Sequence, residues 1–398
     1  MKIEQIKIEK IRLKNIGRFT RQALGQTPYQ STVPISSRRA LSQLNNPYGR
    51  PDDVALLVAL HADKCIGYQG LLPGLFSHQN ELKRIHWSTA FFVSADYRGA
   101  GVAGRLLEEI KKLDIDFPVT RMTTGAQTAY LKAGFEELGH LTYYQLRMEK
   151  IRKLEAIWQE AAAASSLAPN AAETSKTTGL NRAAFGAADA IYQQSKNIFY
   201  QRLLTDSIRK PRSFEYAAVA QIDERAQQII EKRLNGPRFF RGIEAVNWML
   251  THRWLISAAH EKAETEPYYF SLVSELFDYV ALEIYSADKQ AFKGFLILSV
   301  LVKKGRTWVK ILDYAFIDPS DSRLAAYHAL IYAQKFSADR LEFPAELLDY
   351  FKQNPLLQPL IKEQQRRYLY YPRSKGSVLE GYADRIRLDY CDADTTFT

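Results

Sequence analysis

The chain has 398 residues, 46% of them hydrophobic and 25% charged, which is ordinary for a globular protein and long enough for two or three domains. Its net charge is +10, but the basic residues form isolated pairs rather than the dense stripe with interleaved aromatics that nucleic-acid binding favours, so the sequence argues against a nucleic-acid partner. We expect a cytoplasmic protein without a membrane span, because no apolar run reaches bilayer length, the first residues lack a signal-peptide core, and two cysteines make no disulfide framework.

The first half of the chain predicts strands interleaved with helices. Apolar runs and alternating patterns predict strands at 54–61, 66–72, 85–93, 119–124 and 138–148. Helical spacing of apolar residues predicts helices at 37–44 and 101–113. This order is typical of a mixed sheet flanked by helices.

A glycine-rich turn separates the strand that ends at Phe92 and Val93 from the helix at 101–113. The first N–H groups of a helix lack intrahelical partners, and the helix dipole favours an anion there, so we expect this turn to hold phosphate. The residues of the predicted phosphate cradle are Arg98, Gly99, Ala100, Gly101, Val102, Ala103 and Gly104. No Lys-Ser/Thr follows the glycines, which excludes a Walker loop, and the chain beyond them departs from a dinucleotide-binding repeat.

Two motifs resemble the GNAT superfamily of acyl-CoA N-acyltransferases. Arg98, Gly101 and Ala103 match the family's Gln/Arg-x-x-Gly-x-Gly/Ala turn. The segment 126–137 resembles its second motif, a short helix that ends in Tyr-x-x-x-Gly-Phe. The resemblance covers residues 1–150 and implies that acetyl-CoA, or another acyl-CoA, is the co-substrate and that no metal is needed. Residues 1–150 also carry 21 Lys and Arg against 14 Asp and Glu, an excess that suits an anionic cofactor.

The resemblance also suggests catalytic residues. It implies that the strand ending at Phe92 and Val93 lies beside the pantetheine arm and offers backbone N–H groups to the thioester oxygen. Tyr130 stands where family members often carry the general acid, and packing against the cofactor is the alternative role. Glu81 and His86 are the candidates for the base, because the family often places Glu or His on its central strands. The implied activity is transfer of an acyl group, acetyl by default, to a small-molecule or peptide amine.

A linker is predicted between the halves, at 151–212. Residues 161–179 are small and polar, and a connecting helix is predicted at 183–204.

The second half, 213–398, repeats the element order of the first. Strands are predicted at 214–222, 277–285, 292–302, 307–316, 340–343 and 367–371, and helices at 224–234, 243–253, 322–336 and 345–353. This order predicts a second, degenerate GNAT-like domain with an acceptor-shaping or interface role. The fold class is therefore α/β of the α+β type, with two domains that each hold a mixed, mostly antiparallel sheet flanked by helices. The turn Asp318–Arg323 has no glycine and carries two carboxylates, so we expect no CoA binding there.

Two charged segments near the C-terminus are predicted to be solvated. One is the pair Arg366 and Arg367. The other is an acidic tail, 389–394, which we expect to fray, with contact to a cationic acceptor as the alternative. Two other functions remain open. One is an aminoacyl-transferase-like enzyme of cell-wall or polysaccharide metabolism, which the CoA turn argues against. The other is a non-catalytic module that binds CoA or a partner. The oligomeric state cannot be predicted from the sequence.

Overall fold

The computed structural model describes residues 5–24, 29–30, 32–79, 81–150, 214–260, 266–270, 273–355, 357–373, 376–383 and 385–397. The predicted linker and the helix at 183–204 lie outside these residues.

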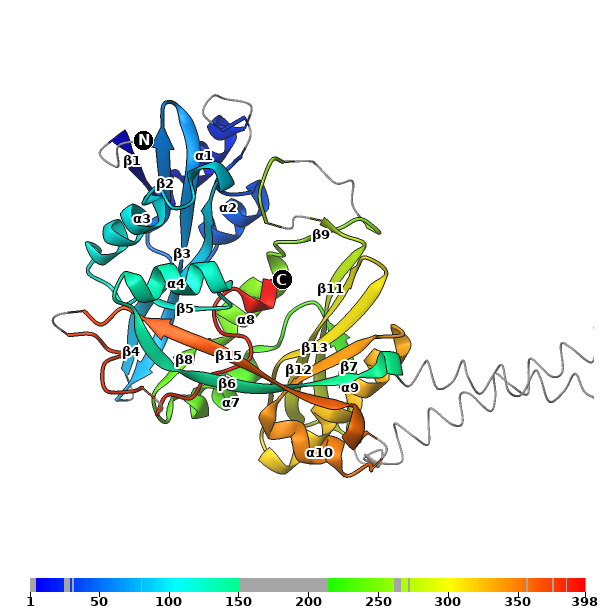
Figure 1. Ribbon diagram of the computed structural model, residues 1–398. Coiled ribbons are helices and arrows are strands. Elements are labelled where there is room, and N and C mark those ends of the chain that lie inside the picture. The colour runs from blue at the N-terminus through cyan, green and yellow to red at the C-terminus, as the bar shows by residue number, and fades with distance from the viewer. Residues whose placement is uncertain are drawn as a thin grey trace, which may run out of the picture.

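One 13-stranded sheet runs through both halves of the described chain, in the order β1-β2-β3-β4-β5-β15-β6-β14-β13-β12-β11-β7, with β8 paired to β3 (Figure 1). Its strands in the first half are β1 (Lys7–Arg12), β2 (Val54–His61), β3 (Lys64–His78), β4 (Glu81–Val93), β5 (Pro118–Thr120) and β6 (Glu136–Arg147). Its strands in the second half are β7 (Phe214–Val219), β8 (Arg238–Phe240), β11 (Leu276–Ser286), β12 (Phe292–Lys303), β13 (Arg306–Phe316), β14 (Arg340–Pro344) and β15 (Ile361–Tyr370). A separate parallel pair joins β9 (Ile256–Ser257) to β10 (Val273–Ser274).

The two halves exchange their last strands at the centre of this sheet. The neighbours of β6 are β14 and β15, both from the second half, and β15 in turn lies between β5 and β6 of the first half. β6 and β15 cross the middle of the molecule in opposite directions (Figure 1). The halves are therefore related by similar topology, but neither half completes its own sheet.

Helices cover both faces of each half. In the first half, α1 (Leu13–Ala23) and α2 (Ser37–Leu44) pack on one face of β2, while α3 (Val102–Lys111) and α4 (Thr124–Lys132) pack on the other. In the second half, α7 (Gln227–Glu231) and α8 (Ile243–Thr251) join the core shared with the first half. The opposite face is covered by α9 (Arg323–Lys335) and α10 (Leu348–Lys352).

The predicted elements within the described residues are present, with shifted bounds. Two N-terminal elements were not predicted, β1 and α1. Four of the six residues of β1, KIEKIR, are charged, which suits an edge strand, where charges discourage further pairing. Within the described residues, no helix combines the length and apolar character needed to cross a bilayer.

A candidate acyl-donor groove and the cavity beside it

The glycine-rich turn forms as its sequence predicts. Gly99 has φ 79° and Gly101 has φ 83°, both in the left-handed region that glycine enters without a Cβ penalty. Gly101 is the N-cap of α3. The N–H of Arg105 donates to the Gly101 carbonyl at 3.1 Å and makes the first backbone hydrogen bond of this helix. The N–H groups of Val102, Ala103 and Gly104 precede it, at a helix start whose surface is open.

Close contact between α3 and β3 fixes the position of this turn. A Cβ on Gly67 would lie 2.9 Å from the Phe92 carbonyl oxygen and 3.0 Å from Val102 Cγ1. Val102, Leu106 and Ile110 are buried against the sheet. The helix start is therefore held rigidly beside the end of β4.

β4 and β5 separate just before this turn. Their ladder is parallel at Ser88 and Val119, and the His86 N–H donates to the Asp116 carbonyl at 2.9 Å. Beyond that point β5 ends, while β4 bulges: Tyr68 pairs with Phe92 and Gly70 with Thr89, so two residues of β4 face one residue of β3. Ala90, in the bulge, has φ 48°. A bulge turns the strand and leaves an extra residue outside the ladder, which opens a groove between the two strands.

Tyr130 lies at the end of this groove. It is 1% exposed, and its hydroxyl donates to Gln69 Oε1 at 3.1 Å and lies 3.0 Å from Ser88 Oγ. The Gln69 amide donates to the Thr89 carbonyl at 2.6 Å, which ties Tyr130 to the bulge. Burial raises the pKa of the Tyr130 hydroxyl well above its usual value, so this hydroxyl keeps its proton at neutral pH. Gln69 belongs to no motif, so no pattern in the sequence points to it.

A cavity of about 400 Å³ opens from the groove toward the second half. Its wall combines the groove residues Ser88, Ala90 and Tyr130 with residues from the second half, including Lys310 and Asp394. Among the described residues that line it, Asp394 is the sole carboxylate, and none is a histidine.

Asp394 is held by a buried arginine. Its Oδ2 lies 3.4 Å from Arg39 Nη2. Arg39 also donates to the Tyr268 hydroxyl at 2.6 Å, and its guanidinium carbon lies 3.9 Å from the centre of the Trp254 ring. The prediction that the tail 389–394 frays is wrong: Tyr390, Cys391 and Asp392 are buried, because the tail packs into the core between the halves.

The two predicted bases lie away from this cavity. Glu81 is in the β3–β4 hairpin with a side chain 69% exposed, 2.5 Å from Lys83 Nζ. His86 is buried, with its Nε2 3.7 Å from Asp53 Oδ1 and its ring edge-on to Phe117. Burial lowers the pKa of His86, so this imidazole is neutral at pH 7. Neither residue lines the cavity beside Tyr130.

Phe92 and Val93 lie on opposite faces of β4. The Phe92 ring packs 4.5 Å from Tyr269 and 5.0 Å from Tyr68 on the α1–α2 side, and Val93 packs against the core under α3. Both side chains are thus used in packing, which leaves the backbone of β4 to face the groove.

The second half repeats the strand geometry but not the turn. β13 and β14 run parallel, and β13 bulges at Leu312, since Ile297 pairs with Asp313 and Leu298 with Ile311. The following turn is capped by Asp318, which accepts from the Ser320 N–H at 2.9 Å.

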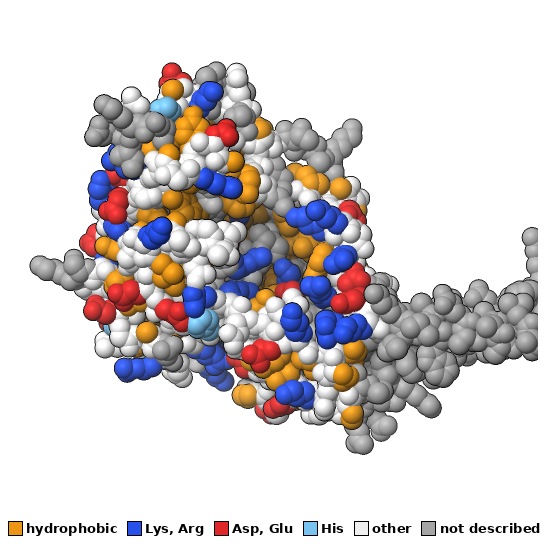
Figure 2. Space-filling model, in the orientation of Figure 1, with side chains coloured by type: hydrophobic (Ala, Val, Ile, Leu, Met, Phe, Trp, Pro, Cys, Tyr) orange, Lys and Arg blue, Asp and Glu red, His pale blue; other side chains and the backbone are white. Residues whose placement is uncertain are grey.

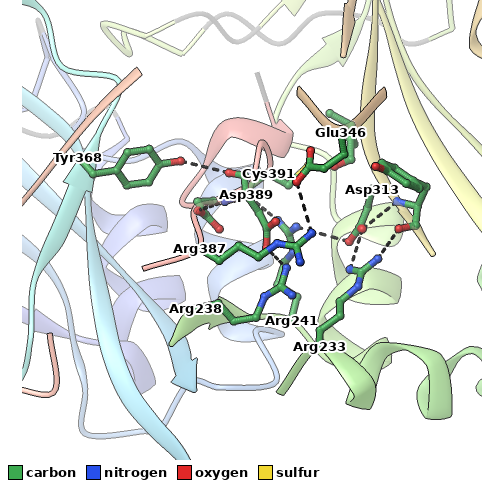
Figure 3. A network of polar contacts seen from close by, with 12 residues as sticks. Arg233, Arg238, Arg241, Asp313, Glu346, Tyr368, Arg387, Asp389 and Cys391 are labelled. Atoms are coloured by element: carbon green, nitrogen blue, oxygen red, sulfur yellow. Dashed lines mark hydrogen bonds and ion pairs between the residues drawn. The ribbon is translucent and has the colours of Figure 1, made fainter. Parts of the chain in front are cut away.

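A network of arginines and carboxylates lines the corresponding cavity in the second half, which has a volume of about 620 Å³ (Figure 3). Arg233 donates to Asp313 at 2.8 Å, Arg238 to Asp389 at 2.5 Å and Arg387 to Glu346 at 3.3 Å. Burial alone would raise the pKa of Asp313, but the arginines hold it below its usual value. These ion pairs join the C-terminal segment to β8 and to the turn after β14, and they join β13 to the residues that follow α7.

Comparisons with known proteins identify a matching domain family and similar folds. Residues 52–137 match the family model of the acetyltransferase (GNAT) domain. The structure is similar to that of Saccharomyces cerevisiae N-myristoyltransferase with bound myristoyl-CoA, at 11% identity and a TM-score of 0.50, over 93% of this chain and 79% of that one. A GCN5-related N-acetyltransferase from Anabaena variabilis matches at 15% identity and a TM-score of 0.48, over 92% of this chain and 72% of that one. No curated protein matches the chain. Residues 52–137 therefore match the GNAT domain family, and they lie in a chain that has a tandem GNAT fold.

Proposed function

We propose that this protein is an N-acyltransferase that moves an acyl group, acetyl by default, from acyl-CoA to an amine. The observation that carries the proposal is the pairing of an open, glycine-built helix start at Gly101 with a groove between β4 and β5. The turn suits the diphosphate of CoA, and the groove suits an extended pantetheine arm. The GNAT match over residues 52–137 supports the same cofactor.

Backbone N–H groups of the groove are proposed to stabilise the thioester carbonyl oxygen during the reaction. Attack by an amine on a thioester develops negative charge on the carbonyl oxygen, and an N–H aimed at that oxygen stabilises the transition state by about 3–4 kcal/mol in known oxyanion holes. The bulge at Ala90 frees β4 backbone for this role. Tyr130, protonated and 3.0 Å from Ser88 Oγ, is the proposed donor of a proton to the departing thiolate.

Asp394 replaces Glu81 and His86 as the proposed base. Asp394 lines the same cavity as Tyr130, and Arg39 fixes the orientation of its carboxylate. A carboxylate at this point can hold the acceptor as an ammonium and then accept its proton as the amine attacks.

The second half is proposed to shape the acceptor side and to bind no CoA. Its turn presents Asp318 where the first half presents Gly99 to Gly101, and carboxylates repel a diphosphate.

The test is protection of the protein by acetyl-CoA against thermal unfolding, followed by acetyl transfer to a panel of amines. At 100 times Kd, acetyl-CoA is expected to stabilise the wild type by about 2.7 kcal/mol. Gly101→Asp is expected to abolish this protection, because a carboxylate would occupy the phosphate site.

Gly381→Asp is the matched control. Gly381 has φ 79° and open space around its missing Cβ, so this variant carries similar backbone strain and the same charge away from the groove. Equal protection of both variants would refute the assignment of the turn. Protection of the wild type without turnover of any amine would favour the non-catalytic module.

A further inference from the structure

The second half contributes an apolar wall to the cavity beside Tyr130. Hydrophobic and basic side chains both occur in and around the hollow between the two halves (Figure 2). The apolar residues that the second half places in the cavity wall are Trp254, Leu255, Phe270, Val273, Leu301 and Phe397. The other described residues of the second half in this wall are Lys303, Lys310 and Asp394. The volume of the cavity, about 400 Å³, lies in the range of small-molecule sites.

The apolar wall is preformed. The one polar side-chain atom among its six residues, Trp254 Nε1, donates to Ser42 Oγ at 2.9 Å. The Phe397 ring stacks on the Trp254 ring, with the two centroids 4.3 Å apart. Both residues are buried, so packing fixes their rings. A molecule in the cavity therefore meets hydrocarbon surface on this side.

The cationic side chains of the same cavity are engaged within the protein. Arg39 pairs with Asp394 and donates to the Tyr268 hydroxyl. The other cationic residues of the wall, which also have interaction partners, are Arg121, Lys303 and Lys310. The charges of this wall therefore give no reason to expect an anionic ligand.

An adjoining cavity, of about 470 Å³, is lined mostly by polar side chains, and its arginines are engaged as well. The prediction that Arg366 is solvated is wrong, because β15 lies inside the sheet and the C-terminal tail packs against this residue. Arg366 Nη1 donates to the Tyr390 carbonyl at 2.7 Å and to Thr395 Oγ1 at 3.1 Å. Arg367 Nε lies 3.2 Å from Glu137 Oε2. An apolar molecule is therefore expected against the wall around Trp254 and not in this second cavity.

Asp394 gives the cavity with the apolar wall a carboxylate that can accept further hydrogen bonds. Its Oδ2 lies 3.4 Å from Arg39 Nη2, which is longer than a usual charge-assisted hydrogen bond. Among the described residues, none donates a hydrogen bond to its Oδ1. A carboxylate oxygen readily accepts from an ammonium, and apolar surroundings strengthen such a pair. The cavity thus suits a molecule that is cationic at one end and apolar over the rest.

We propose that the acceptor is a small primary amine with an apolar body, which lies against the wall around Trp254 and Leu301 while its ammonium meets Asp394. The inference rests on the proposed acyl transfer for the role of the amine. An apolar body gains free energy when it leaves water for this wall, whereas a polar body loses its hydrogen bonds with water and finds few partners there. A fatty acyl chain is the rival occupant, but it would bring no positive charge to Asp394.

Three primary amines with the same charge test this proposal: phenethylamine, cyclohexylethylamine and the polar diglycolamine. Calorimetric titration, with and without CoA, is expected to show that at least one of the two apolar amines binds about tenfold more tightly than diglycolamine. Burial of a hydrocarbon ring is worth a factor of at least this order. Equal affinity for all three compounds, or tighter binding of diglycolamine, would overturn the proposal.

Leu301→Gln makes the wall polar at a half-buried position of β12, and it is expected to remove most of the preference for the apolar amines. Leu301→Met keeps the wall apolar and is expected to keep the preference. Val273→Gln, at a second half-buried position of the wall, makes the same test should Leu301→Gln fail to fold. An undiminished preference in a folded Gln variant would also overturn the proposal.

Leu276→Gln is the matched control. Leu276 is also half-buried and lies on the neighbouring strand β11, but it packs against the other core, which α9 covers. It lines neither cavity, so the preference for apolar amines is expected to stay as in the wild type.

Thermal protection by octanoyl-CoA, compared with that by acetyl-CoA, tests the rival occupant. We expect Leu301→Gln to leave the protection by both esters unchanged, because the apolar wall holds the amine. Stronger protection by octanoyl-CoA that Leu301→Gln removes would assign the wall to the acyl chain and overturn the proposal.

Protection by acetyl-CoA also separates this inference from the proposed function. If acetyl-CoA protects and diglycolamine is acetylated as fast as the apolar amines, acyl transfer stands and the apolar acceptor is wrong. If acetyl-CoA does not protect, the proposed function fails, while the amine titrations without CoA still decide the preference for an apolar body.

Discussion

At the scale of single residues, Asp394 has two structural roles. Its carboxylate forms an ion pair with Arg39, and it lines the cavity beside Tyr130. Arg39 is 7% exposed and also stacks on Trp254, so the pair is fixed by packing as well as by charge. This arrangement fixes the orientation of the carboxylate that is the proposed base.

Asp394→Asn is predicted to lower kcat by about 10²–10⁴-fold, the usual contribution of a general base, because the amide cannot accept the proton of the amine. Steady-state acetyl transfer, with acetyl-CoA affinity measured alongside, is the assay. The control is Asp392→Asn. Burial raises the pKa of Asp392, and this residue lies outside the cavity, so its replacement is expected to leave kcat near that of the wild type. A normal kcat in Asp394→Asn would exclude this base.

Tyr130 has two possible roles, proton donor and anchor of the bulge. Tyr130→Phe keeps the ring contacts with Phe91 and Phe135 but removes the hydroxyl between Gln69 and Ser88. We predict a turnover loss of about 10²-fold or more with little change in acetyl-CoA affinity. The unpaired Gln69 oxygen is expected to cost about 1–3 kcal/mol of stability, read from chemical unfolding.

Ser88→Ala separates the two roles of Tyr130. This variant also breaks the contact with the hydroxyl, at 3.0 Å, but leaves the phenol in place. Turnover that falls equally in both variants would assign Tyr130 an anchoring role, and unchanged turnover in Tyr130→Phe would remove it as the acid.

At the scale of elements, the donor groove depends on how closely α3 approaches β3. Gly67→Ala would place a methyl group 2.9 Å from the Phe92 carbonyl oxygen. We predict a loss of about 1–3 kcal/mol in unfolding free energy from overpacking, together with weaker acetyl-CoA binding, because the start of α3 would shift away from β4.

Gly125→Ala makes the same chemical change in α4, where nothing lies within 4 Å of the added Cβ. Ala is the better helix former, so this control is expected to be as stable as the wild type or up to about 1 kcal/mol more stable. Urea unfolding of both variants measures the difference. An undestabilised Gly67→Ala would show that α3 tolerates displacement.

At the scale of the whole molecule, strand exchange makes the two halves interdependent. Both neighbours of β6 belong to the second half, and β15 separates β5 from β6. The core between the halves includes Trp87 and Leu138 from the first half and Trp254 and Phe295 from the second.

A fragment of residues 1–150 is therefore predicted to aggregate and to bind no acetyl-CoA, because β6 would have no strand beside it. The full chain is expected to unfold in a single calorimetric transition. The comparison protein is a full-length chain cut at a protease site inserted within 151–212, which should keep its acetyl-CoA protection, since the exchanged strands hold the two pieces together. A soluble, acetyl-CoA-binding 1–150 fragment would contradict this view.

The sequence by itself determined the glycine-rich turn at the start of α3, the short helix that carries Tyr130 and the repeated order of strands and helices. These features are local: a left-handed glycine, unpaired N–H groups at a helix start and an apolar period are set by residues a few positions apart. Only the tertiary structure decided which strands are neighbours and which distant side chains meet. Asp394 and Tyr130 line the same cavity, Arg366 is buried and Glu81 remains on an outer hairpin. Sheet register and the docked tail decide these positions, and neither can be read from a segment in isolation.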